Sequence, residues 1–203
     1  MTRFGLPSLL VFCGLILLWE AAVLRTGVSE IILPAPSAVA AVLYDGLVTG
    51  FLWPHIWITT TETLLGLFLG CSIGFLSGLL LSESSGLRRL LWPYILASQV
   101  VPKLALGPLF IIWFGFGMKS TVIITALICF FPLLENTLTG LDSAPREKRD
   151  LFRMLGANRL QTLFRLKIPS GLPMIMTGVR IAGVLALVGA VVGEFIGGNS
   201  GLG

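Results

Sequence analysis

Charged side chains are scarce in this sequence. Only 14 of its 203 residues are Lys or Arg and 10 are Asp or Glu, so 12% of the chain is charged, whereas a soluble domain averages about a quarter. Apolar residues make up 55%, and the mean hydropathy is +0.94. So few charges do not cover the surface of a water-soluble body, and the composition predicts a membrane protein covered by lipid.

Groups for catalysis or metal binding are also few. His55 is the only histidine, and it stands at the entry to an apolar segment, as an interfacial residue does. Cys13, Cys71 and Cys129 lie far apart inside apolar runs, without the CxxC or Cys/His spacing of a zinc site. We therefore expect no catalytic residue, no metal and no cofactor.

The sequence also lacks the features of nucleotide-binding and nucleic-acid-binding proteins. It contains no GxxxxGK[ST] loop to hold phosphates, so this chain is expected to bind no nucleotide itself. The net charge is +4, but the basic residues lie between apolar runs rather than beside aromatic residues on a polar surface. We expect no nucleic acid as a partner.

Five apolar segments reach the length of a transmembrane helix, which needs about 20 residues. They are residues 6–24, 56–81, 92–117, 120–141 and 172–196. The first could also be a secretory signal, but it has no clean small-x-small cleavage site and more spans follow, which favours an uncleaved helix. The sequence predicts an all-α membrane protein with one transmembrane domain over residues 1–203.

Glycine and proline give two of these spans a distinct character. The second span contains four glycines at intervals of four, which share one helix face and let another helix approach closely: Gly66, Gly70, Gly74 and Gly78. The third span contains Pro102, Gly107 and Pro108, which predict a break near mid-depth.

The connections between the spans are predicted as follows. Residues 27–55 form a loop with one surface helix, which Ser37 caps and which runs through Val48. Residues 82–91 form a short polar loop, and Met118 with Lys119 makes a tight connection to the fourth span.

Lys and Arg are in excess in cytoplasmic loops, and this bias orients the chain. With the N-terminus inside, Arg3, Arg88, Arg89 and seven basic residues of the 142–170 loop face the cytoplasm, and only Arg25 and Lys119 lie outside. The sequence therefore predicts a cytoplasmic N-terminus and a cytoplasmic 142–170 loop.

The 142–170 loop is the longest charged stretch, and it has structure of its own. Its apolar residues recur at helical spacing, and Gly156 divides them into two short amphipathic helices. Such helices either lie on the lipid surface or dock on a protein partner.

The sequence DLFRMLGANRLQTLFRLKIPSGLPMIMTGVRIA resembles the cytoplasmic signature of binding-protein-dependent ABC permeases. That signature has an EAA triplet, a glycine after three more residues, and a later aliphatic-Pro pair. In the family it forms the coupling helix, which docks on the ATP-binding subunit. The resemblance assigns this role to Asp150, Leu151, Phe152, Leu155, Gly156, Ala157, Ile168 and Pro169, with DLF in place of EAA.

The resemblance extends over residues 33–203. LPAPSAV, LLGLFLG, PKLALGPLFIIWFGFG, FFPLLENTLTGL and GEFIGGNSGLG are similar to permeases of the nitrate, sulfonate, taurine and pyrimidine-precursor importer branch. This implies the type I ABC importer permease fold. Members usually continue with another span, so the five spans here are expected to represent six, with the sixth missing at the C-terminus.

The implied function is that of the permease subunit of an ATP-driven importer for a small anionic or heterocyclic organic solute. The implied partners are an ATP-binding subunit, a periplasmic or lipid-anchored solute-binding protein, a second copy in a homodimer and the lipid of a bacterial cytoplasmic membrane. An ion channel and a membrane-embedded enzyme are the alternatives, but neither a filter-like loop nor a nucleophile with its base is present.

Charged residues within spans are functional candidates because a buried charge costs a few kcal/mol in lipid. Lys103 in the broken third span either attracts an anionic solute or pairs with Glu135. Glu62 and Glu194 are predicted near the outer interface, where they can extend to water, in structural roles. The remaining candidates for the translocation pathway are Gln99, Thr125 and Asn136.

Overall fold

The computed structural model describes residues 6–197 and 200–203, and every regular element in that part of the chain is a helix. The all-α prediction is confirmed. The chain divides into two units, Met1–Pro54 and His55–Gly203.

The first unit contains helices α1 (Leu6–Thr26) and α2 (Pro36–Val48). The prediction that Ser37 caps the second of these was wrong, because α2 begins at Pro36, whose fixed φ suits the first helical position. Ser37 instead donates its N–H and its hydroxyl to the two carboxylate oxygens of Glu20, at 3.1 and 2.7 Å. These bonds join α2 to α1.

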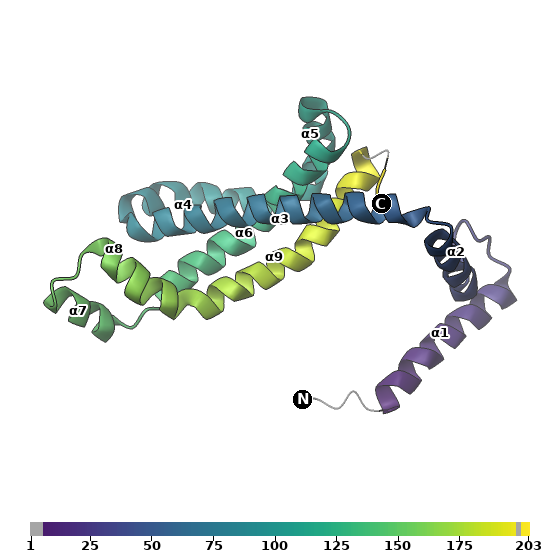
Figure 1. Cartoon of the computed structure of the whole chain (residues 1–203), viewed down its shortest axis with the longest axis horizontal. Coiled ribbons are helices and arrows are strands. Elements are labelled where there is room, and N and C mark those ends of the chain that lie inside the picture. Colours follow the sequence, from purple (N-terminus) through teal and green to yellow (C-terminus); the bar gives the residue numbers. More distant parts are fainter. Residues whose placement is uncertain (1–5, 198–199) are drawn as a thin grey trace. The chain divides into compact units, whose positions relative to one another are not determined.

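The second unit is built on α6 (Met118–Asp142), against which α3 (Leu52–Glu83) and α9 (Ile168–Gly197) pack (Figure 1). The predicted glycine face of α3 is confirmed, since all four glycines are buried. A Cβ added at Gly66 would lie 2.5 Å from Thr125 Cβ, and one at Gly78 would lie 2.7 Å from Thr137 Cβ. Only glycine allows α3 to approach α6 this closely.

Small residues of α9 make the corresponding contact with α6. A Cβ at Gly178 would lie 2.8 Å from Asn136 Cβ, and one at Gly193 would lie 2.9 Å from Thr121 Cγ2. Cys129 of α6 donates its thiol hydrogen to the carbonyl of Ala182 at 3.4 Å. The three helices therefore form the core of this unit.

The predicted polar loop over residues 82–91 was wrong. Helix α3 continues to Glu83, and α4 (Ser85–Val100) begins two residues later. Only Ser84 leaves helical geometry, and its hydroxyl accepts a hydrogen bond from the N–H of Leu87 at 3.3 Å, which caps α4.

The predicted break in the third span is confirmed. Helix α4 ends at Val100, and η1 (Lys103–Leu106) and α5 (Gly107–Phe114) continue at an angle of 85°. The connection to α6 lies at Gly115 and Gly117, which have φ of 83° and 100°, so the connection predicted at Met118 and Lys119 was wrong. Those two residues begin α6.

The 142–170 region continues directly into the last long helix. After α7 (Arg146–Met154) and a turn, α8 (Arg159–Thr162), a π-helical turn η2 (Leu163–Lys167) and α9 run on without a gap. Helical structure thus begins at Arg159, before the predicted span at 172–196.

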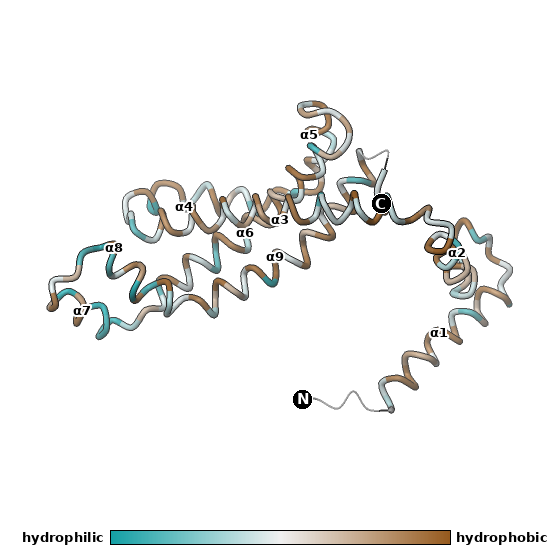
Figure 2. The backbone as a smooth tube through the Cα atoms, in the orientation of Figure 1, coloured by the Kyte–Doolittle hydropathy of each residue, from teal (hydrophilic) through white to brown (hydrophobic). Residues whose placement is uncertain are grey.

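Four helical segments of the described chain are long and apolar enough to cross a membrane, and the bent pair is a fifth if it crosses as one broken span. The four are Pro7–Thr26, Leu52–Glu83, Met118–Asp142 and Arg159–Gly197. Figure 2 shows apolar residues along these helices and polar residues gathered over α7 and α8.

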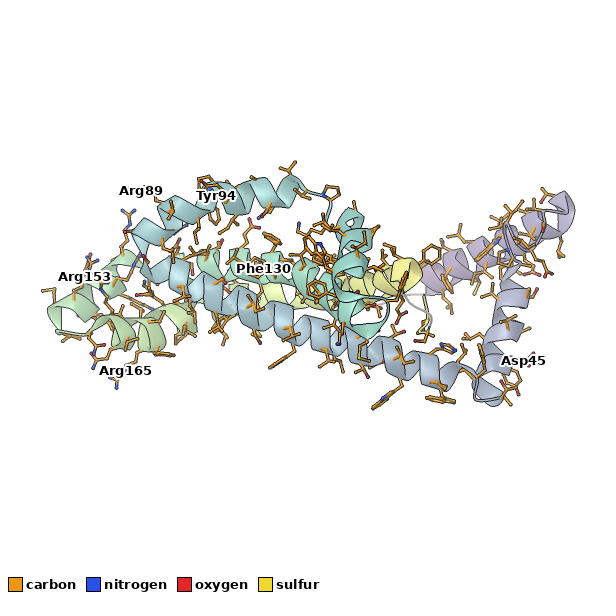
Figure 3. All side chains as sticks on the ribbon, turned by 90° about the horizontal axis from the view of Figure 1, so that it is seen from above. Asp45, Arg89, Tyr94, Phe130, Arg153 and Arg165 are labelled. Carbon is orange, nitrogen blue, oxygen red and sulfur yellow. The ribbon has the colours of Figure 1, made fainter. Side chains whose placement is uncertain are left out.

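One end of the second unit, here called the charged end, gathers ionic side chains. Lys167 pairs with Glu83 at 2.6 Å, and Arg88 pairs with Asp142 at 2.6 Å, so the pairs join four helix ends. Arg89, Arg153 and Arg165 lie at this end (Figure 3).

Candidate functional site

The predicted pathway residues can be located around a cavity of about 350 Å³ in the second unit. We call it the Lys103 cavity. Its lining comes from α4, η1, α6 and α9: Gln99, Lys103, Ile128, Phe131, Pro132, Glu135, Asn136, Ile181 and Leu185. Four of the five residues proposed from the sequence therefore meet here.

Lys103 contacts an aromatic ring in this cavity. Its Nζ lies 4.5 Å from the centre of the Phe131 ring, a cation–π contact worth about 0.5–2 kcal/mol. The alternative in which Lys103 pairs with Glu135 is not realised, because no such ion pair is present among the described residues. The ammonium therefore has donors available for a solute.

The α6 wall of the cavity has a locally altered backbone. Pro132 has no N–H to donate to the carbonyl of Ile128 one turn earlier. Asn136 donates its side-chain amide to the Pro132 carbonyl at 2.8 Å, which fixes the Asn136 side chain. The helix stays continuous, and its missing backbone hydrogen bond thus lies where residues of α6 line the cavity.

Thr125 lies elsewhere. It is fully buried, where Gly66 of α3 and Gly189 of α9 both approach α6. The structure therefore places it in the helix packing, outside the Lys103 cavity.

A second polar cluster lies at the other end of α9. Glu62 and Glu194 are each 2% exposed, so the prediction that they extend to water was wrong. The hydroxyl of Thr59 donates to Glu194 at 2.6 Å.

The backbone of the last residues completes this cluster. The N–H of Gly203 donates to Glu194 at 2.8 Å, that of Leu202 to Thr59 Oγ1 at 2.9 Å, and that of Gly201 to His55 Nδ1 at 3.0 Å. The donors are backbone N–H groups of residues 201–203, whose sequence indicates only a loop. The sequence analysis therefore missed the cluster.

The turn after α7 has the geometry of a Schellman motif. Gly156 has φ of 72°, and its N–H donates to the Arg153 carbonyl at 3.0 Å. The N–H of Ala157 donates to the Phe152 carbonyl at 2.9 Å. Asn158 and Gln161 then form a capping box that starts α8. The predicted division into two short helices at Gly156 is confirmed.

The segment around this turn presents apolar side chains outward. Leu151 is 53% exposed and Leu155 is 74% exposed, while Asp150 forms a weak pair with Arg153 at 3.4 Å. Ile168 and Pro169 lie apart from this turn, at the start of α9.

Comparison with known proteins identifies the family. Residues 63–203 match the family described as binding-protein-dependent transport system inner membrane component. The chain belongs to this family.

Relatives of this permease have names that agree with the match. The formylaminopyrimidine transport permease protein of Halalkalibacterium halodurans is 38% identical over 98% of this chain and 79% of its own length. The riboflavin transport system permease protein of Chloroflexus aurantiacus is 41% identical over 98% of this chain and 74% of its own length. A putative aliphatic sulfonates transport permease protein of Bacillus subtilis is 32% identical over 99% of this chain and 73% of its own length.

The function class follows from the family. The chain is a multi-pass membrane permease, the transport subunit of an ABC importer, with the type I importer permease fold. The resemblance to the sulfonate, taurine and pyrimidine-precursor branch is confirmed by these relatives.

Sequence reasoning on this permease left out Arg180. It is exposed on α9, and none of the described residues forms an ion pair or hydrogen bond with it. A basic residue within a long apolar span is the signal that reveals such a position.

Proposed function

We propose that this permease forms the solute pathway of an ATP-driven importer as a homodimer. The ATPase is a separate polypeptide, and a periplasmic or lipid-anchored binding protein delivers the solute. The permease lies in a bacterial cytoplasmic membrane with its N-terminus and its charged end in the cytoplasm. The excess of Lys and Arg at the charged end supports this orientation.

The proposed docking site for the ATPase is the segment from Asp150 to Ala157. The observation that supports it is a rigid turn that holds exposed leucines outward, since the described part of the chain leaves Leu151 and Leu155 largely uncovered. Phe152 is half-buried, and its carbonyl accepts the hydrogen bond from the N–H of Ala157 that closes the turn. Ile168 and Pro169 act indirectly, because they start the helix that carries motion into the membrane.

Co-purification tests the docking site. Leu155→Asp places a charge in the proposed interface without disturbing the permease core, and we expect it to abolish co-purification of the ATPase. Arg89→Ser is the matched control, because Arg89 is exposed at the same end but outside the segment. If the ATPase still co-purified with the Leu155→Asp variant, the proposed docking site would be contradicted.

The proposed translocation pathway includes the Lys103 cavity. Its volume of about 350 Å³ lies at the lower end of small-molecule sites. Gln99, Lys103, Glu135 and Asn136 offer it donors and acceptors, and Phe131 offers an aromatic face. We propose a small organic solute of the kinds named for the relatives, an aliphatic sulfonate or a small heterocycle.

Uptake into vesicles that contain the whole importer tests the pathway. Riboflavin, formylaminopyrimidine and an aliphatic sulfonate are the solutes to compare, each with and without ATP. Lys103→Gln is expected to lower uptake at least about tenfold, since a charged hydrogen bond is worth about 1.5–3 kcal/mol. Lys119→Gln removes an exposed cation outside the cavity and should leave uptake unchanged. Equal uptake by the two variants would place the pathway elsewhere.

A further inference from the structure

Arg180 stands deep within the apolar length of α9. At 1.5 Å per residue it lies about 20 Å along the helix axis from Lys167, which belongs to the charged end. Gly197 lies about 26 Å beyond Arg180, so Arg180 is near the middle of α9 and within a hydrocarbon core about 30 Å thick. Long basic side chains reach the interface from the ends of spanning helices, and this position is too far from either end.

The side of α9 that carries Arg180 faces away from the rest of the core. Gly178 and Ala182 contact α6, and Arg180 is two residues from each, which is about 200° around the helix. Its neighbours on that side are exposed, with Val184 at 66% and Leu187 at 54%.

Among the described residues of the second unit's core, no acidic side chain neutralises Arg180. Glu194 accepts hydrogen bonds from Thr59 and Gly203, and Glu62 lies beside Glu194. Glu135 lines the Lys103 cavity. Among the described residues Arg180 has neither an ion pair nor a hydrogen bond. A guanidinium in this state is not stable against hydrocarbon, where it costs several kcal/mol.

We propose that the side of α9 around Arg180 lines the water-filled solute pathway, and that its guanidinium binds the negatively charged group of the solute. This inference rests on the proposed function above. The next residue, Ile181, lines the Lys103 cavity, and Arg180 lies about 100° further around α9, outside the lining of that cavity. The guanidinium fork matches the paired oxygens of a carboxylate, sulfonate or phosphate. The structure thereby favours a small organic anion over a neutral solute.

Thiol labelling of the assembled importer tests whether this side of α9 is wet. Arg180→Cys is compared with Phe68→Cys, because Phe68 is 69% exposed on α3 and lies about 22 Å along that helix from Glu83. Phe68 also stands two residues from Gly66 and Gly70, and so faces away from α6. The unsubstituted permease gives the background from its own cysteines. Sulfonatoethyl methanethiosulfonate should modify Arg180→Cys at least about tenfold faster, and equal rates or no modification would overturn the proposal.

A second labelling experiment tests the role of the charge. Val184→Cys, one turn from Arg180, is modified by an anionic and by a cationic methanethiosulfonate, and the ratio of the two rates is measured. Arg180→Gln should lower this ratio at least about threefold, whereas Arg180→Lys should keep it. A ratio that is the same with Arg, Lys and Gln would show that Arg180 exerts no field on the pathway and would overturn the proposal.

The two proposals fail in different ways. ATP-independent uptake by the unsubstituted importer would contradict the proposed function. If uptake needs ATP but Arg180→Cys is not labelled, the function stands and the assignment of Arg180 falls.

Discussion

Gly156 is the residue on which the geometry of the proposed docking segment, residues 150–157, depends. Its φ of 72° costs glycine no steric strain, costs asparagine less than most residues, and strains alanine by about 1 kcal/mol. No atom of the described chain would clash with an added Cβ, so the conformation alone is tested. Gly156→Ala should open the turn and speed tryptic cleavage at Arg153 and Arg159 about fivefold. Gly156→Asn should be cut more slowly than Gly156→Ala, and identical rates would contradict the role of the turn.

Thr59 connects the buried acid Glu194 to the last residues of the chain. Thr59→Val keeps the shape but removes the hydroxyl, so Glu194 Oε1 loses its hydrogen bond from Thr59 and the N–H of Leu202 loses its acceptor. This substitution should lower the free energy of unfolding by about 1–3 kcal/mol, as measured by denaturation in detergent. Thr59→Ser retains both bonds and should behave like the native permease. A stable Thr59→Val variant would show that the cluster contributes little.

The sequence identified the four polar residues of the Lys103 cavity but not their contacts. Gln99, Lys103, Glu135 and Asn136 were found because polar groups in apolar spans are rare. Whether Lys103 contacts Glu135 or Phe131 depends on the direction in which η1 leaves α4. The spacing of residues in the sequence does not define that direction. Thr125 has the same polarity as a pathway residue but lies on the packed face of α6, and only the positions of α3 and α9 reveal this.

At the scale of helices, glycines determine how closely α3 and α6 pack. A Cβ at Gly70 would clash with the carbonyl oxygen of Ala126 and would lie 2.8 Å from Cys129 Cβ. Gly70→Ala should therefore destabilise the permease by about 1–3 kcal/mol, measured by denaturation in detergent. A Cβ added at Gly183 in α9 would have no atom of the described chain within 4 Å, so Gly183→Ala should be neutral or stabilising. Equal effects of the two substitutions would contradict close packing as the reason for Gly70.

Two helix boundaries were predictable from a proline or a glycine. The break between α4 and η1 follows from Pro102, and the turn after α7 follows from Gly156. The start of α4 was missed because SESSGLRRLL is polar, and polarity was taken to mean a loop. A single serine that ends one helix and caps the next leaves almost no trace in a hydropathy pattern.

At the scale of the whole molecule, the orientation in the membrane can be tested. Lys148 is exposed on α7, and Lys148→Cys should react with an impermeant thiol reagent in inside-out vesicles but not in intact cells. Lys119→Cys, exposed at the start of α6, should show the opposite pattern. Labelling of Lys148→Cys from outside the cell would reverse the orientation and separate the docking segment from any cytoplasmic ATPase.

The continuous helix from Arg159 to Gly197 has a mechanical consequence. At the end of its π-helical turn the N–H of Ile168 donates to the carbonyl of Leu163, five residues earlier. This turn of backbone is wider than the α-helical turns on either side. From there to Gly197 the helix is about 45 Å long, so a pivot of about 10° at that turn swings the far tip by about 8 Å. In the proposed function, a small tilt that the ATPase imposes on the short arm would be amplified into this displacement of the helix tip at the opposite membrane surface.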